Sequence, residues 1–252
     1  MKLVYLSEMR LPTRNAHGFQ VMRMCGAFAK HAEVELLVPC RKTPIAGDSF
    51  EFYHVEKNFK ITKLFAVDLY PFRFIPERIS YLVHLFSFLI SARIYLWRHS
   101  YDHLYSRERF LSWFFKKFVA EVHTLPPPHG AEKYVTITRA LAQELERAGI
   151  KKEQILVAPD AVDLAHFGGG IKKEEARKTL GLQVGQKIVL YFGNFRSWKG
   201  VDTLARAVPL LPDVHVMLVG ATKESDLDRI RELAGMYQNV TILGFRDHAE
   251  VP

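Results

Sequence analysis

The feature of this 252-residue chain that most restricts its fold is an alternation of short apolar runs with helical segments, which starts near the N-terminus and starts again near residue 187. Lys2–Ser7 is typical of a buried strand. A loop leads from it to Phe19–His31, where apolar residues recur at helical spacing, and Glu33–Val38 then indicates a second strand. Strand, helix and strand in this order predict a βαβ unit with a parallel sheet.

The first half of the chain continues this alternation. We expect further strands over Phe50–Val55, Lys60–Phe65, His103–Ser106, Phe118–His123, Tyr134–Thr138 and Gln154–Ala158. We expect helices over Ile79–Trp97, Phe110–Lys117 and Arg139–Ala148.

One connection does not fit the pattern. Only residues 124–133 join the strand that ends at His123 to the strand that begins at Tyr134, and the prolines at 126, 127 and 128 exclude a helix there. A crossover between parallel strands needs about a dozen residues or more and usually contains a helix. Either the two strands are not parallel neighbours, or a helix that usually stands between such strands is missing.

The second half repeats the pattern after a linker at 163–170, which ends in three glycines. We expect a helix over Lys173–Leu180, strands over Lys187–Phe192, Val214–Val219 and Val240–Leu243, and helices over Val201–Leu211 and Asp226–Met236. The sequence therefore predicts an α/β protein with two doubly wound, Rossmann-like domains, 1–166 and 167–252. Three strands are too few for a finished doubly wound domain, so we expect the C-terminal domain to be incomplete.

Composition narrows the classes of function. Hydrophobic residues make up 48% of the chain and charged residues 25%, which excludes a globally disordered protein. The net charge of +8 favours an anionic partner. No run of like charges and no nucleic-acid motif accompany it, so we expect no nucleic-acid partner. Cys25 and Cys40 lack metal-ligand spacing, and the N-terminus lacks a signal-peptide pattern, so we expect a cytoplasmic protein with two free thiols.

The strongest chemical signal follows the expected strand Lys187–Phe192. The loop Gly193-Asn194-Phe195-Arg196-Ser197-Trp198-Lys199-Gly200 leads from its carboxyl end into a helix. Ligands bind at the carboxyl ends of parallel strands, and free N–H groups at a helix start favour phosphate. Arg196 and Lys199 add positive charge there. The loop is neither a P-loop nor a GxGxxG turn, so these residues alone leave a phosphate site and a solvated basic turn open.

With Val201-Asp202-Thr203-Leu204, this loop resembles the G-[R/S/N]-[L/F]-x-x-x-K-G-x-D-x-L signature of family 4 retaining glycosyltransferases. Other segments resemble further steps of that family in the right order: Thr136–Leu141 its ITxxL step, Val157–Asp163 its V-x-P-N-G-V-D step, Leu218–Gly220 its LVG strand and Asn239–Gly244 its NVxFLG strand. The family's E-x7-E signature is absent and its place lies beyond Pro252, so we expect the chain to be an incomplete version of such an enzyme.

The resemblance implies a GT-B architecture, with a nucleotide sugar bound mainly to the C-terminal domain and the acceptor to the N-terminal one. It implies transfer of a hexose to a glycan, lipid or small-molecule acceptor with retention of configuration, with no cofactor and no metal required. Lys199 would contact the donor diphosphate, Gly193 would let the backbone approach the phosphates, and Gly244 and Phe245 would lie near the nucleobase. Asn194 stands where the family has an arginine, and Arg196 is a candidate to replace it.

The resemblance also implies site residues in the N-terminal half. Arg14-Asn15-Ala16-His17-Gly18 resembles the family's first loop, where small residues such as Gly18 let the backbone approach the transferred sugar and the acceptor. His123 resembles the active-site histidine that hydrogen-bonds the donor sugar, although a lone histidine at a strand end is more often structural. Arg107, Glu108 and Arg109 are interpreted as a surface charge network.

Two other interpretations stay open. A nucleotide-sugar epimerase or dehydrogenase has Rossmann-like halves, but it would need a GxGxxG turn where this chain has Ser7–Pro12. A non-catalytic membrane-associated binding module is suggested by the apolar segment Ile79–Trp97 and the basic charge. Because Arg93 disfavours a membrane span, we expect a buried helix there. Contact with anionic lipid at the inner membrane face is the alternative, aided by arginines 73, 78, 93 and 98.

Overall fold

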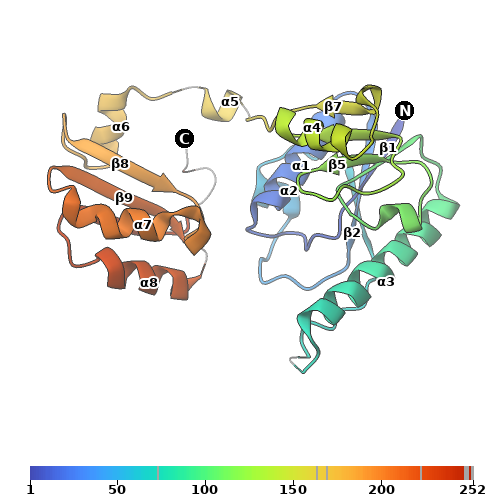
Figure 1. Cartoon of the computed structure of the whole chain (residues 1–252), viewed down its shortest axis with the longest axis horizontal. Helices are drawn as coiled ribbons and strands as arrows, with labels where there is room; N and C mark the ends of the chain where they lie inside the picture. Colours follow the sequence, from blue (N-terminus) through green and yellow to red (C-terminus); the bar gives the residue numbers. More distant parts are fainter. Residues whose placement is uncertain (73, 163, 169, 222, 247–249, 251–252) are drawn as a thin grey trace. The chain divides into compact units, whose positions relative to one another are not determined.

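The computed structural model describes residues 1–72, 74–162, 164–168, 170–221, 223–246 and 250 (Figure 1). The chain forms two compact units, Met1–Ala161 and Val162–Pro252. The sequence placed the boundary between domains a few residues later, at 166/167. Within the expected linker 163–170, residues 163 and 169 lie outside the described residues, as does Arg73.

The N-terminal unit is built on a seven-stranded parallel sheet with the strand order β3-β2-β1-β4-β5-β6-β7. Its strands are β1 (Lys2–Leu6), β2 (Glu33–Pro39), β3 (Lys60–Leu64), β4 (His103–Ser106), β5 (Val119–Val122), β6 (Lys133–Thr136) and β7 (Ile155–Val157). Its helices are α1 (Ala16–Phe28), α2 (Ser49–Tyr53), α3 (Glu77–Arg98) and α4 (Arg139–Arg147). The strand order reverses between β1 and β4, and such a switch point is where open α/β sheets bind ligands.

Two apolar layers cover the two faces of this sheet, because successive side chains of a strand point to opposite sides. Val4 and Leu6 of β1 pack in a core with α3 and α4, whereas Tyr5 packs in a second core with α1 and α2. Leu85 and Phe88 of α3 are fully buried, and burying a side chain of this size stabilises the fold by about 1.5–3 kcal/mol. The long green helix in Figure 1 is therefore held to the sheet by one of its faces.

The connection between β5 and β6 contains no helix, yet the two strands are parallel neighbours, with Val119 opposite Lys133. The alternative that they are not parallel neighbours is therefore wrong. Both strands have four residues, so the chain has little distance to return, and residues 123–132, all of them described, cover it as an irregular loop. The prolines exclude a helix, as expected, but do not prevent the pairing.

Two other sequence predictions are wrong in this unit. The expected strand Phe50–Val55 is helix α2, because the Asp48 side chain accepts hydrogen bonds from the backbone N–H groups of Phe50 and Glu51 and so starts a helical turn. The expected helix Phe110–Lys117 is only a 3₁₀ turn over Leu111–Trp113. The expected strand Lys60–Phe65 is confirmed as β3, with its end one residue earlier.

The C-terminal unit has a three-stranded parallel sheet of order β10-β9-β8. Its strands are β8 (Lys187–Phe192), β9 (Val214–Ala221) and β10 (Val240–Gly244), and its helices are α5 (Leu164–Phe167), α6 (Lys173–Thr179), α7 (Val201–Ala207) and α8 (Glu224–Ala234). Residues of α7, α8 and β9 form its core around the fully buried Phe195. The strand–helix alternation predicted for this half is confirmed.

Candidate functional site

The carboxyl edge of the second sheet is lined by glycines. Gly193 follows β8, Gly220 lies near the end of β9 and Gly244 ends β10. The N–H of Gly193 donates to the carbonyl oxygen of Val219 at 2.9 Å, and a Cβ on Gly220 would lie 2.9 Å from the carbonyl oxygen of Gly193. Gly193 and Gly220 have φ angles of 147° and 116°, which side-chain-bearing residues rarely adopt. Bare backbone is therefore what this edge offers to a ligand.

The loop that leaves this edge is anchored from three sides. Phe195 is fully buried, and the hydroxyl of Tyr191 donates to the Asn194 carbonyl oxygen at 2.7 Å. From α8, Arg229 contacts both the carbonyl oxygen of Phe195 and the carboxylate of Asp202. These contacts tie the loop to two helices, which fixes its shape before any ligand arrives.

The basic residues of the loop stand on its exposed side. Arg196 and Lys199 are both exposed, and the Lys199 N–H donates to the Arg196 carbonyl oxygen at 2.9 Å in a short 3₁₀ turn. The Lys199 ammonium lies 5.3 Å from the centre of the Trp198 ring, within the range of a cation–π contact. Gly200, with a φ of 80°, then turns the chain into α7. An anion can reach both cations at this turn.

Gly244 is the last residue of the third strand, and Phe245 follows it at the same edge. Val219 of β9 pairs with Phe192 of β8 on one side and with Leu243 of β10 on the other. The register between β9 and β10 then shifts, so Gly244 pairs with Ala221. The structure thus brings the six donor-site residues predicted in this half to one edge of one sheet. Their contacts with a donor stay predictions.

Sequence reasoning missed two residues at this edge. The LVG step places Gly220 at a strand end, which is a sequence signal for a site residue, but the sequence analysis takes it only as evidence of a strand. Arg229 had no signal, because its partners lie 34 and 27 residues away along the chain.

In the N-terminal unit, Gly18 is required by packing. A Cβ on Gly18 would lie 2.5 Å from the Tyr53 hydroxyl and 2.6 Å from a methyl carbon of Thr13. That hydroxyl donates to the Thr13 carbonyl oxygen at 2.8 Å and accepts from the Thr13 N–H at 2.6 Å. Gly18 thus lets α2 clamp the loop before α1, and its contact with a sugar stays a prediction.

His123 directly follows β5, at the carboxyl edge of the first sheet. Its Nε2 contacts Oε1 of Glu121, a buried side chain whose Oε2 accepts a hydrogen bond from the Tyr5 hydroxyl at 2.6 Å. Burial alone would raise the pKa of Glu121, but the hydrogen bonds from His123 and Tyr5 and the charge of Arg107 outweigh it and hold that pKa below its ordinary value. The predicted sugar-binding histidine is therefore in contact with a buried carboxylate.

Arg107, whose charge acts on Glu121, also contacts α1. Its Nη1 donates to Oε1 of Gln20 at 3.1 Å, and the amide of Gln20 in turn contacts Asp160. Burial, together with the charge of Arg107, lowers the pKa of His17 in the first turn of α1. Polar side chains thus gather where α1, β4 and β5 meet at the switch point of the sheet.

The prediction of a surface charge network at 107–109 is wrong for Glu108, which is buried. Its Oε1 accepts a hydrogen bond from the N–H of Glu8 at 2.9 Å. Burial raises the pKa of both carboxyl groups, and the charge of Glu108 adds to the rise at Glu8. The sequence could not show this, because the partners lie 100 residues apart.

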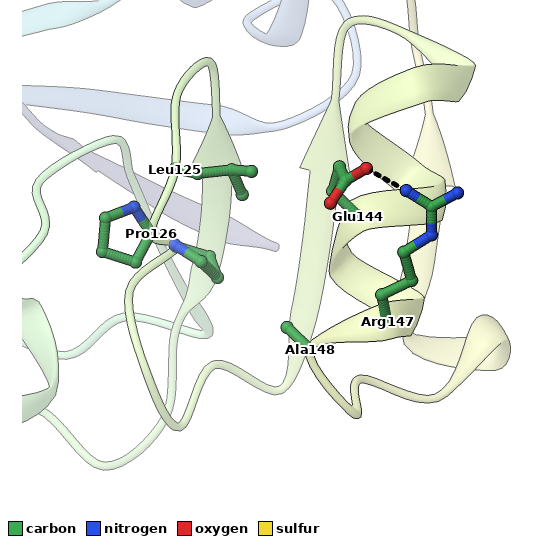
Figure 2. Close-up of a pocket in the computed structure, with 6 residues that line it drawn as sticks. Leu125, Pro126, Glu144, Arg147 and Ala148 are labelled. Carbon is green, nitrogen blue, oxygen red and sulfur yellow. Dashed lines mark hydrogen bonds and ion pairs between the residues drawn. The ribbon is translucent and has the colours of Figure 1, made fainter.

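Beside the β5–β6 loop the surface is hollowed, as Figure 2 shows. The lining residues are Leu125, Pro126, Pro127, Glu144, Arg147 and Ala148. Glu144 and Arg147 of α4 pair with each other there, and no predicted site residue lines the hollow. Among the residues that the structure describes, no three His, Cys, Asp or Glu side chains are grouped so as to hold a metal ion.

Comparison with solved structures defines the class of fold. Sucrose-phosphate synthase from Thermosynechococcus elongatus matches with a TM-score of 0.72 and 18% identity, over 98% of this chain and 71% of that one. The HepE protein of Anabaena in complex with UDP-glucose matches with a TM-score of 0.58 and 17% identity, over 98% and 69%. The chain has the fold of the GT-B glycosyltransferases, which confirms the predicted fold class.

The sequence comparisons agree with this class of fold. Residues 172–252 match the glycosyl transferases group 1 model. A D-inositol 3-phosphate glycosyltransferase of Mycolicibacterium gilvum is 39% identical over 103 residues, which are 38% of this chain and 23% of that protein. The chain thus matches less than a quarter of the length of that relative. Most of the C-terminal unit matches the glycosyl transferases group 1 model, in agreement with the resemblance drawn from the sequence.

The fold by itself does not exclude the epimerase interpretation. A UDP-GlcNAc 2-epimerase from Neisseria meningitidis bound to UDP-GlcNAc matches with a TM-score of 0.63 and 11% identity, over 99% of this chain and 74% of that one. The family match, which is to glycosyl transferases, separates the two classes.

Proposed function

We propose that this protein transfers a hexose from a nucleotide sugar to an acceptor, with retention of configuration. The observation that carries this proposal is the edge formed by Gly193, Gly220 and Gly244, from which an anchored loop presents Lys199. An edge without side chains, beside an exposed ammonium, is suited to a diphosphate. That HepE of Anabaena was solved with UDP-glucose supports a nucleoside diphosphate sugar as donor.

The proposed chemistry follows from where charge develops. When the glycosidic bond of the donor breaks, negative charge accumulates on the leaving diphosphate. Lys199 and the neighbouring backbone amides would stabilise this charge, so the reaction would need neither a metal ion nor a cofactor. His123 would hydrogen-bond the donor sugar.

Titration calorimetry with UDP, GDP and ADP tests the donor site. Lys199→Ala should weaken binding of the preferred nucleotide by about 1.5–3 kcal/mol, the worth of a hydrogen bond to a charged group, and should barely change the melting temperature. Lys187→Ala is the matched control, because it removes the same charge from the opposite end of β8 and should not affect binding. Equal affinities of wild type and Lys199→Ala would exclude Lys199 from the site.

We propose in addition that the protein is cytoplasmic and touches anionic lipid through helix α3. Ile79, Ile90, Ile94 and Trp97 lie on one face of α3 and are 48–77% exposed, while the opposite face packs on the sheet. The exposed Arg93 lies beside this stripe. Among the described residues, α3 alone is long and apolar enough to cross a bilayer, with a mean hydropathy of 1.5. Its buried face favours contact with a membrane surface over a span.

Liposome co-sedimentation tests this contact. The protein should sediment with vesicles that contain anionic lipid and remain in solution with purely zwitterionic ones. Trp97→Ala and Arg93→Ala should each reduce binding, whereas Arg147→Ala, which removes an exposed arginine from α4, should not. Equal binding by all variants, or none by the wild type, would contradict the proposal.

A further inference from the structure

Glu121 is a buried carboxylate with a specific pair of donors. Its side chain is 2% exposed; Oε2 accepts from the Tyr5 hydroxyl, Oε1 contacts Nε2 of His123, and the Tyr105 hydroxyl is a further hydrogen-bonding neighbour. Burying a charge costs several kcal/mol unless its hydrogen bonds are made, so a carboxylate at this place requires both donors. These contacts connect Tyr5 of β1, Glu121 of β5 and His123, which follows β5.

The contact through Nε2 determines what the imidazole of His123 can do. A carboxylate oxygen is only an acceptor, so Nε2 must carry the proton of the contact. In a neutral ring the other nitrogen, Nδ1, then has a free electron pair and accepts hydrogen bonds. The His123 side chain is 18% exposed, so the ring is partly open to solvent at the carboxyl edge of the sheet.

We propose that Glu121 is the positioning residue of His123, fixing the neutral ring as the Nε2–H tautomer so that Nδ1 accepts a hydrogen bond from a sugar hydroxyl. The tautomer follows from the contacts of Glu121 and Tyr5. The role of the sugar hydroxyl rests on the proposed function. The expected ligand carries a hydroxyl group that donates a hydrogen bond to Nδ1 of His123.

A carboxylate suits this task better than its amide. Both of its oxygens accept, so it satisfies Tyr5 and His123 together. A glutamine has one accepting oxygen and one donating nitrogen, and because the Tyr5 hydroxyl can donate or accept, either amide group can face His123. Glu121→Gln therefore keeps the size of the side chain but removes the constraint on the proton of His123.

Nitrogen-15 NMR of the histidine rings at pH 8 tests the tautomer without any ligand, with His123 assigned from a His123→Gln sample. In the wild type, Nε2 should have the chemical shift of a protonated nitrogen and Nδ1 that of an unprotonated one. In Glu121→Gln both shifts should move toward those of mixed tautomers. Glu35→Gln is the matched control, because Glu35 is equally buried on β2 and its hydrogen-bond partners among the described residues include no histidine, so the His123 signals should not move.

Wild-type His123 with its proton on Nδ1, or unchanged signals in Glu121→Gln, would overturn the proposal. Should Glu121→Gln fail to fold, Tyr5→Phe provides a second test: it keeps the carboxylate, so the Nε2–H tautomer should persist, and its loss would contradict the role of Glu121.

Measuring turnover of the nucleotide sugar tests whether the positioning of His123 by Glu121 contributes to catalysis. Glu121→Gln should lower kcat about tenfold or more, the range for one misplaced polar contact, and leave the KM for the donor nearly unchanged. A shifted tautomer with full turnover would refute the positioning role. A wild-type protein without transferase activity would instead refute the proposed function, while the NMR result would still decide the tautomer.

Discussion

The ion cluster around Glu35 gives the sharpest prediction for stability. Glu35 lies on β2 with its side chain 2% exposed, and its Oε1 accepts from the Thr62 hydroxyl at 2.6 Å and the Tyr95 hydroxyl at 2.7 Å. The Lys60 ammonium lies 2.9 Å from the same oxygen, and the Lys2 ammonium lies 3.5 Å from Oε2. This one carboxylate joins β1, β2, β3 and α3.

The magnitude follows from the pKa of Glu35. Burial alone would raise this pKa, but the hydrogen bonds from Thr62, Lys60 and Tyr95 outweigh it and lower the pKa from 4.5 to about 2. A folded-state pKa below the unfolded one stabilises the protein at pH values above 4.5, and this stability is lost as the pH falls toward 2. The shift corresponds to about 3 kcal/mol at pH 7, of which roughly half remains at pH 3. Because Lys60 is well exposed, about 2–3 kcal/mol is the expected range.

Urea denaturation of the wild type and of Glu35→Gln at pH 7, 5 and 3 measures this difference. The variant should be less stable by about 2–3 kcal/mol at pH 7, and the gap should narrow by about 1–2 kcal/mol between pH 5 and pH 3. A gap that is the same at all three pH values would show that Glu35 acts by packing alone. That result would refute the electrostatic reasoning.

Three further predictions concern the site edges. Gly18→Ala should destabilise the N-terminal unit by about 1–3 kcal/mol in chemical denaturation, because its Cβ would overlap the Tyr53 hydroxyl, and equal stability would show that this contact gives way. Gly220→Ala should cost about 1–3 kcal/mol from its φ of 116° and should weaken nucleotide binding; calorimetry that finds neither would contradict the close approach to Gly193. Glu108→Gln should raise the free energy of unfolding at pH 8 more than at pH 5, because burial raises the pKa of Glu108 and its ionised form disfavours the folded state; an equal effect at both pH values would contradict this.

Local sequence patterns predicted the elements whose cause is local. The strand at Lys187–Phe192 was placed with its observed ends, since a short apolar run between turn residues is a strong signal. Residues 50–55 were expected to form a strand, but the Asp48 cap starts a helical turn there. The donor residues predicted in the C-terminal half lie at one edge because strand ends in a parallel sheet meet there.

The hydrogen bonds of the buried carboxyl groups join residues far apart in the chain, so the sequence could not predict them. The hydroxyl of Tyr5 reaches Glu121 across 116 positions, and Glu8 reaches Glu108 across 100. No periodicity within either segment indicates the other. The sequence predicts for Glu121 only a place in a strand, because its burial beside Tyr5 follows from the order of strands and not from its neighbours in the chain.

The helix-free return from β5 to β6 gives this fold a natural place for insertion. Residues 123–132 pass beside the hollow of Figure 2 and join two strands that pair in parallel. Doubling the length of such a loop costs only about 0.6 kcal/mol in closure entropy. A helix could therefore be added between two strands that are already in register, and proteins with this sheet can differ at this loop by whole elements without a change in topology.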